Sequence, residues 1–205
     1  MSEARSSLDA AATLAAGAKT RIDGDEFVDD IVSLVARLKE EIAARGQPWR
    51  AVVGVVRGGV FPAQRVAEAL RLDYREIRIS YYLGTERQDE PRLLQGLADE
   101  REGEGLLVVD DVVDSGGTAL CLRRMWPRCD LAAVYTKPAG LAAATSAWGS
   151  APIHGRHMDA KWIVFPWDQP GWETLSPLLI AAFREKTADK RVGFDPDQNF
   201  SAPRR

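Results

Sequence analysis

The chain has 205 residues, of which 45% are hydrophobic and 28% charged, and its formal net charge of −3 gives no electrostatic footprint for nucleic acid. No apolar run approaches the roughly 20 residues needed to span a bilayer, and residues 1–20 lack the apolar segment of a signal peptide. With two cysteines, which suit a reducing compartment, we expect a cytoplasmic protein with no membrane or nucleic-acid partner.

Both ends of the chain are predicted to be flexible. Residues 1–22 are small, polar and weakly periodic, and residues 187–205 are polar and contain two prolines. Neither segment offers enough apolar side chains to form a core. We therefore expect one folded domain over residues 23–186, between an N-terminal extension and a C-terminal tail.

Helical and strand patterns alternate through this domain. Apolar residues at helical spacing predict a helix that starts near Asp25 and stops before Gly46 and Pro48. The valine-rich run Ala51–Val56 predicts a strand buried on both faces. The same patterns predict strands over residues 74–79, 106–109 and 131–135, and helices over residues 61–70, 118–126 and 172–186. This order indicates an α/β fold with a central, mostly parallel sheet flanked by helices.

One segment interrupts the alternation. Residues 83–104 are rich in acidic side chains and hold few residues that form a core. We expect a mobile excursion there, in which the acidic run Asp99–Glu104 is a solvated face.

The segment Leu106–Thr118 carries the strongest chemical signal. A buried strand delivers Asp110 and Asp111 at its carboxyl end, where ligands bind in open α/β sheets. A turn with two glycines then opens a helix, so its backbone N–H groups can hold a phosphate. The residues of this cradle are Ser115, Gly116, Gly117 and Thr118.

The two adjacent acids need a separate reason. Carboxylates beside a phosphate site would repel the ligand unless hydroxyl groups or a cation lie between them. Ribose hydroxyls and a hydrated Mg²⁺ meet this need, because Mg²⁺ is usually held by carboxylates, waters and substrate phosphates. The segment therefore predicts a site for a sugar phosphate with a divalent metal; the alternative is a strand–turn–helix joint with solvated acids.

Leu106–Thr118 also resembles the signature with which type I phosphoribosyltransferases bind 5-phosphoribosyl 1-pyrophosphate (PRPP). The shared pattern is two hydrophobic residues, two acids, two hydrophobic residues and Asp-Ser-Gly-Gly-Thr. The resemblance implies that Asp110 and Asp111 hold the ribose hydroxyls and the water shell of Mg²⁺, and that residues 114–118 hold the 5′-phosphate. It also implies that Asp114 is the catalytic general base.

A second anion loop follows the strand Ala51–Val56. Arg57 offers charge-assisted hydrogen bonds and Gly58 and Gly59 allow close approach, which suits the pyrophosphate of PRPP and its departure in catalysis. Family members often have Ser or Lys before this arginine, whereas this chain has Val56.

Two further segments suit a purine base. Lys137 ends a strand and can donate to the exocyclic oxygen of a 6-oxopurine; a solvated strand-end lysine is the alternative. Trp162 opens the aromatic run Trp162–Trp167 and can stack on a purine ring, while an aromatic core strand is the alternative. Together the motifs are similar to bacterial xanthine-guanine phosphoribosyltransferases, which implies that the base lies on Lys137, Trp162 and the main chain of Ile163, under a small hood.

The resemblance implies three further properties. Ser80 and Tyr81 would belong to a flexible lid that closes over the site and excludes water. The partners would be PRPP and xanthine, guanine or hypoxanthine, with Mg²⁺ as cofactor. The chain would form a homo-oligomer, a dimer or a tetramer.

The sequence leaves two alternatives open. The first is the same fold acting on another base, and the second is a non-catalytic regulator that binds PRPP or a nucleotide.

The only histidines, His154 and His157, flank Gly155 in an expected loop. No Cys or acidic cluster completes a metal site around them, so we expect no metal there.

Overall fold

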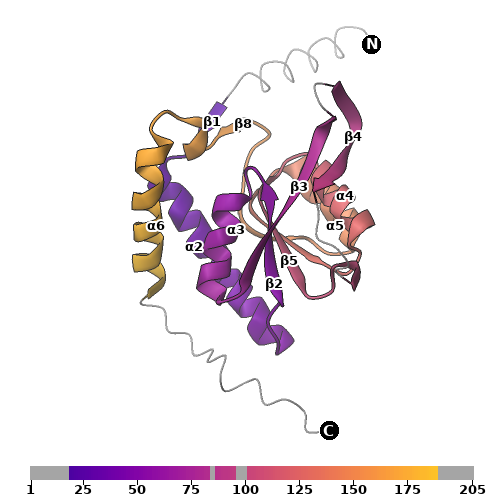
Figure 1. Ribbon diagram of the computed structural model, residues 1–205, viewed down its shortest axis with the longest axis horizontal. Helices are drawn as coiled ribbons and strands as arrows, with labels where there is room; N and C mark the ends of the chain where they lie inside the picture. Colours follow the sequence, from indigo (N-terminus) through magenta and orange to yellow (C-terminus); the bar gives the residue numbers. More distant parts are fainter. Residues whose placement is uncertain (1–18, 84–85, 96–100, 189–205) are drawn as a thin grey trace, which may run out of the picture.

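A six-stranded sheet runs through the centre of the protein (Figure 1). The computed structural model describes residues 19–83, 86–95 and 101–188. The strand order is β4-β3-β2-β5-β6-β7, and every neighbouring pair is parallel except β3 with β4. The predicted α/β fold with a mostly parallel sheet is therefore confirmed. The strands are β2 (Ala51–Val56), β3 (Asp73–Leu83), β4 (Glu86–Gln95), β5 (Leu106–Val113), β6 (Asp130–Thr136) and β7 (Ile153–His157).

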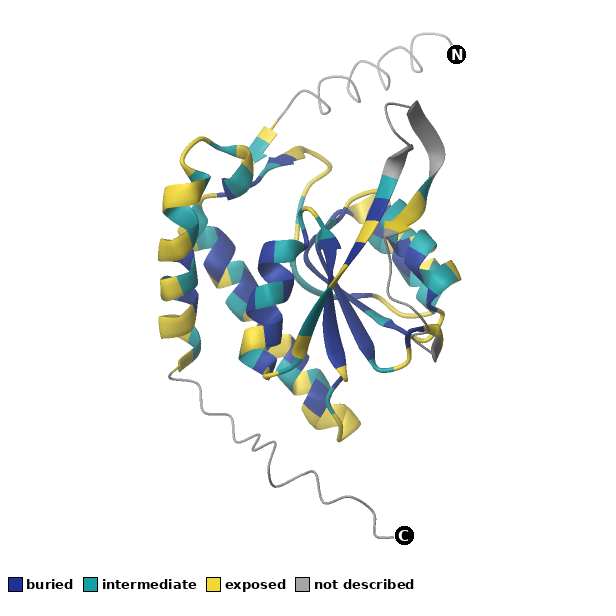
Figure 2. Cartoon of the chain, viewed as in Figure 1, coloured by how far each residue is buried: buried dark blue, intermediate teal, exposed yellow. Residues whose placement is uncertain are grey.

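Helices cover both faces of the sheet. On one face lie α2 (Gly24–Arg45) and α3 (Val60–Leu70), and on the other lie α4 (Gly117–Met125) and α5 (Pro138–Trp148) (Figure 1). Each layer buries its own apolar cluster against the sheet, which appears as the dark interior in Figure 2. The alanine-rich helix α5 was not predicted from the sequence.

The long helix α2 shows how local signals define an element. The Asp23 carboxylate accepts a hydrogen bond from the Glu26 N–H at 2.8 Å, which caps the start of the helix. Gly46 ends it in the left-handed conformation, with φ +73°. Between these caps the apolar side chains are buried at helical spacing.

A small hood joins the two ends of the described chain. The strand β1 (Lys19–Arg21) pairs in parallel with β8 (Trp162–Val164), and α6 (Trp172–Ala188) packs against α2. The predicted N-terminal extension is wrong for its last residues, because residues 19–21 form a strand and the Ile22 side chain is fully buried. The helix α6 also runs two residues past the expected boundary at 186. Residues 1–18 and 189–205 lie outside the described residues.

The described parts of residues 83–104 also differ from the prediction, while residues 84–85 and 96–100 lie outside the described residues. The strand β4 pairs antiparallel with β3 and adds a strand to the sheet, so this part is not an excursion from the fold. A short 3₁₀ turn, Arg101–Gly103, then leads into β5. None of the helices in the described ranges has the length and apolar character to cross a membrane.

A polar cluster ties α2 to β6 and β7. The buried Tyr135 hydroxyl donates to Asp30 Oδ2 at 2.7 Å, and Arg156 forms ion pairs with Asp30 at 3.0 Å and with Glu26 at 2.8 Å. Burial raises the pKa of Asp30, and the hydrogen bond from Tyr135 opposes that rise. Tyr135 and Arg156 therefore stabilise the ionised form of the half-buried Asp30 carboxylate.

Tyr135→Phe should lower the free energy of unfolding by about 1–2 kcal/mol, because Asp30 loses a buried donor. Without this donor the folded-state pKa of Asp30 rises further, and stability is lost as the pH rises through it. The cost should therefore be larger at pH 7 than at pH 5 in urea titrations. Tyr74→Phe is the control, since the Tyr74 hydroxyl bonds the exposed carboxylate of Glu76; equal costs at both positions would contradict this assignment.

Candidate functional site

The site lies where the strand order reverses. The neighbours β2 and β5 are followed by connections to opposite sides of the sheet, which makes their carboxyl ends the expected ligand crevice. The loop after β2 meets the loop after β5 there. A Cβ atom on Gly58 would lie 2.1 Å from Asp111 Oδ2, so glycine is required for this close approach.

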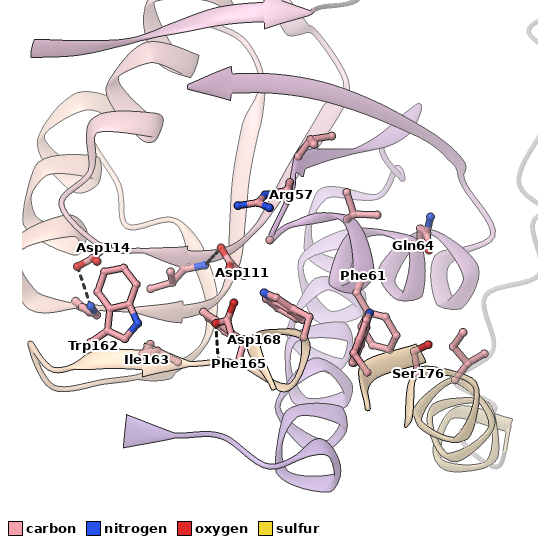
Figure 3. Close-up of a pocket in the computed structure, with 18 residues that line it drawn as sticks. Arg57, Phe61, Gln64, Asp111, Asp114, Trp162, Ile163, Phe165, Asp168 and Ser176 are labelled. Carbon is pink, nitrogen blue, oxygen red and sulfur yellow. Dashed lines mark hydrogen bonds and ion pairs between the residues drawn. The ribbon is translucent and has the colours of Figure 1, made fainter. Parts of the chain in front are cut away.

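A pocket of about 860 Å³ opens at this crevice (Figure 3). Its wall is built from both loops, the start of α3, the end of β6 and the hood. The lining residues are Val56, Arg57, Gly58, Val60, Phe61, Gln64, Asp111, Val112, Asp114, Lys137, Trp162, Ile163, Phe165, Trp167, Asp168, Trp172, Ser176 and Ile180. The structure thus brings together the predicted pyrophosphate arginine, one of the paired acids, Asp114 and the predicted base-binding residues.

A smaller hollow of about 60 Å³ adjoins the pocket, and Asp114 lines both. The hollow is lined by Asp110, Ser115, Gly116, Gly117 and Thr118, together with Val112, Val113, Ala119 and Leu131. Gly116 has φ +87° and precedes the first residue of α4, Gly117. The predicted phosphate cradle therefore surrounds a cavity at a helix N-terminus, which is a favourable place for an anion.

The first turn of α5 supports this loop from behind. A Cβ atom on Gly140 would lie 2.3 Å from the Val113 carbonyl oxygen and 2.4 Å from that of Asp114. These are backbone atoms, so they cannot move aside without displacing the loop. Gly140 therefore fixes the position of the cradle without lining it.

Gly140→Ala should weaken PRPP binding by at least about 10-fold, because the loop must shift. Isothermal titration with PRPP and Mg²⁺ measures this. Gly149→Ala is the matched control at the other end of α5: Gly149 has φ +77° and no atom near its missing Cβ, so this change should cost only stability, about 1 kcal/mol. Unchanged PRPP affinity in Gly140→Ala would contradict the supporting role of Gly140.

Burial disfavours the charged forms of the paired acids. Asp110 is 8% exposed, and burial together with repulsion from Asp111 raises its pKa well above the ordinary value. Burial also raises the pKa of Asp111, with a further contribution from the charge of Asp168. Asp110, Asp111 and Asp168 thus share one region in which a further negative charge is disfavoured.

This donor set fits Mg²⁺ held largely by substrate. Carboxylate oxygens are suitable ligands, but among the described residues no group of three His, Cys, Asp or Glu side chains converges as a complete metal site. A metal that completes its shell with water and substrate phosphates needs no more than one or two carboxylates. Asp110 and Asp111 are the residues that could hold it.

Lys137 and Asp114 form an ion pair at one end of the pocket. The distance from Lys137 Nζ to Asp114 Oδ1 is 3.0 Å; the lysine side chain is 6% exposed and the aspartate 54% exposed. Trp162 lies beside them with 61% of its surface exposed, and Ile163 is buried below (Figure 3). A flat ligand placed on Trp162 would meet both members of the ion pair at its edge.

Arg57 projects over Asp111 from the loop after β2 (Figure 3). It follows a cis peptide bond from Val56 and is exposed, and its side chain makes no hydrogen bond or ion pair with the rest of the described chain. Its guanidinium is therefore available to an anion in the pocket. Gly59, in contrast, does not line the pocket: a Cβ there would lie 2.6 Å from the Val109 carbonyl oxygen, so this glycine allows close packing behind the loop.

Of the two predicted lid residues, Ser80 lies outside the pocket wall. Ser80 is on β3, in the part that pairs with β4, and is not among the residues that line the pocket. The side chain of Tyr81 lies outside the described residues. The lid function of Ser80 and Tyr81 therefore stays a prediction.

The opposite end of the pocket was not predicted from the sequence. Phe61 and Gln64 on α3 face Trp172, Ser176 and Ile180 on or near α6 there (Figure 3). The rings of Phe61 and Trp172 are 5.2 Å apart in an edge-to-face arrangement. The amphipathic pattern of both helices was visible in the sequence, but no local signal indicated that they face each other.

Comparisons with known proteins agree with this geometry. A model of the phosphoribosyl transferase domain matches residues 23–168. A purine phosphoribosyltransferase from Pyrococcus horikoshii Ot3 is similar at 22% identity and a TM-score of 0.54, over 74% of this chain and 95% of that one. A hypothetical protein from Neisseria gonorrhoeae with bound ppGpp is similar at 22% identity and a TM-score of 0.58, over 80% of this chain and 97% of that one. A xanthine-guanine-hypoxanthine phosphoribosyltransferase from Helicobacter pylori is similar at 18% identity and a TM-score of 0.53, over 78% of this chain and 98% of that one.

Proposed function

Since this chain belongs to the phosphoribosyltransferase family, we propose that it transfers the ribose 5-phosphate of PRPP to a 6-oxopurine and releases pyrophosphate. The base would be xanthine, guanine or hypoxanthine. Purine and xanthine-guanine-hypoxanthine phosphoribosyltransferases share its fold, which supports a purine substrate.

The observation that carries the 6-oxo assignment is the buried Lys137. Its ammonium lies at the pocket wall beside Trp162 and has three N–H groups, of which Asp114 accepts one. A carbonyl oxygen at position 6 of a stacked purine would accept another. An amino group there would instead place donor against donor in a desolvated position, which disfavours adenine.

The remaining residues fit the two ends of PRPP. The cradle Ser115–Thr118 would hold the 5′-phosphate at the N-terminus of α4, and Asp110 and Asp111 would hold the ribose hydroxyls. Arg57 and the backbone at Gly58 would hold the pyrophosphate. Asp110 and Asp111 are the residues that would hold Mg²⁺, and the chemistry it would supply is neutralisation of charge on the leaving pyrophosphate.

In the reaction, the bond from ribose C1 to the pyrophosphate oxygen breaks and a bond from C1 to a purine nitrogen forms. Arg57 stabilises the departing pyrophosphate. Asp114 accepts the proton of the attacking nitrogen, and its ion pair with Lys137 positions its carboxylate for that task. Binding both substrates on rigid loops aligns the nitrogen with C1.

The test of substrate class is nucleotide formation from PRPP and Mg²⁺, with guanine, xanthine, hypoxanthine, adenine and uracil offered separately. Turnover of one or more 6-oxopurines, and at least about 100-fold less of adenine, supports the proposal. Turnover of adenine or uracil alone would show the same fold acting on another base. We also expect a dimer or tetramer in light scattering, as the family resemblance implies.

Asp114→Asn separates an enzyme from a regulator. It should lower kcat by about 10²- to 10⁴-fold, because the amide cannot accept the proton, while the Kd for PRPP changes by less than about 10-fold. Single-turnover assays and calorimetry measure the two quantities. If the wild-type chain binds PRPP or ppGpp but forms no nucleotide with any base, the protein is a nucleotide-binding regulator and the proposal fails.

A further inference from the structure

The two histidines lie together on the edge strand of the sheet. His154 and His157 are both on β7 and pair with Ala133 and Thr136 of β6. The Nε2 atoms of the two rings are 3.0 Å apart. The loop expected from the sequence around Gly155 is therefore wrong, and the strand holds the two imidazoles against each other.

The outer nitrogen of each ring has its own partner. His154 Nδ1 lies 2.9 Å from the carbonyl oxygen of Pro152, which can only accept, so this nitrogen carries the proton. The Nε2 atom of His154 consequently bears a lone pair. His157 Nδ1 lies 2.8 Å from the hydroxyl of the buried Thr136. Partners of this kind orient the imidazoles that bind metals in proteins.

The two imidazole rings do not meet end-on. The centre of an imidazole lies about 1.1 Å from its nitrogen, so an end-on N–H···N bond of this length would separate the ring centres by roughly 5 Å. The centres of His154 and His157 are 4.3 Å apart and the rings are tilted by 48°. The hydrogen bond between the two Nε2 atoms is therefore bent and not end-on.

We propose that His154 and His157 form a binding site for one divalent transition-metal ion of the Cu²⁺ or Ni²⁺ class. At the roughly 2.0–2.1 Å bond between a metal and an imidazole nitrogen, two nitrogens 3.0 Å apart subtend an angle of about 94° at the ion. That angle suits adjacent positions of a tetragonal ion better than a tetrahedral one. No third His, Cys, Asp or Glu joins them within the described ranges, so water fills the other positions.

The site is separate from the proposed PRPP and base site. Neither histidine lines either cavity described above. His157 is exposed and His154 half-buried, so an ion can reach them from solvent. The magnesium expected at Asp110 and Asp111 would be bound by oxygen atoms, whereas imidazole pairs favour Cu²⁺ and Ni²⁺.

The chain allows a direct test because it has no other histidine. Untagged protein is titrated with CuCl₂ in excess Mg²⁺ and followed by electron paramagnetic resonance, in which each bound imidazole nitrogen splits the signal. We expect one Cu²⁺ per chain with two imidazole nitrogens. His154→Gln and His157→Gln should each lower the affinity by at least about 30-fold, and Thr136→Val by about 10-fold through the orientation of His157.

Two results would overturn the proposal. A copper affinity unchanged from the wild type in both histidine variants would place the ion elsewhere, for example at a cysteine or the chain's amino terminus. A wild-type spectrum with a single imidazole would leave the two rings joined by a hydrogen bond only. The wild-type spectrum needs no variant to fold, and thermal melts verify that each substituted protein is intact.

Discussion

Replacing Lys137 with alanine should lower kcat/KM for 6-oxopurines by about 10²- to 10³-fold, the effect of removing one well-placed donor from a desolvated site. The preference for these bases over adenine should fall with it, because the truncated site no longer opposes an amino group. The Kd for PRPP should change little, since Lys137 belongs to neither of the two anion-binding loops. Initial rates with guanine, hypoxanthine and adenine, together with PRPP calorimetry, measure all three quantities.

The same substitution should not destabilise the protein. The Lys137 side chain is only 6% exposed, so burying its charge costs free energy of desolvation. Its partner Asp114 is more than half exposed, so water can solvate this carboxylate once the lysine is removed. Lys161→Ala provides the control, because Lys161 is a hood lysine with 46% exposure that pairs with Asp159 at 3.7 Å. Equal losses of activity in both variants, or a loss of PRPP affinity alone, would contradict base recognition by Lys137.

The sequence could predict the elements around the site because their signals are local. The run Ala51–Val56 is a buried strand in the structure, as its valines indicate. The predicted cradle forms a loop at a helix N-terminus because Gly116 takes a positive φ that other residues adopt rarely. Such signals act within a few residues and need no knowledge of the fold.

The parts that escaped prediction depend on contacts between distant segments. The pairing of Lys19 with Trp162 joins strands of three residues each, which are too short to show a period. The far end of the pocket depends on how α6 packs against α2 and α3, and the sequence of no single helix predicts this packing. The contact of His154 with His157 likewise follows from the pairing of β7 with β6.

Asp110→Asn should make the empty protein more stable while it weakens substrate binding. Burial and the charge of Asp111 raise the folded-state pKa of Asp110. A carboxyl group with a raised folded-state pKa contributes stability below the ordinary value of roughly 3.9 and loses that contribution as the pH rises through the folded-state pKa. At neutral pH this carboxyl group therefore opposes folding, and an uncharged amide of the same shape does not.

We expect a gain of about 1–2 kcal/mol at pH 7, or roughly 2–4 °C in Tm per kcal/mol, and a smaller gain at pH 5. Differential scanning calorimetry of the empty protein measures this gain. PRPP with Mg²⁺ should stabilise the wild type strongly and the variant weakly, because the variant has lost a contact to ribose or metal.

Asp159→Asn is the control for this experiment, since the Asp159 side chain is 81% exposed and its charge is solvated. It should change neither Tm nor the response to PRPP. A lower Tm in Asp110→Asn would mean that Asp110 stabilises the fold as an ion. A higher Tm with an unchanged response to PRPP would remove Asp110 from the substrate site. Both changes together would identify a carboxylate pair whose repulsion destabilises the empty protein and is relieved when PRPP and Mg²⁺ bind.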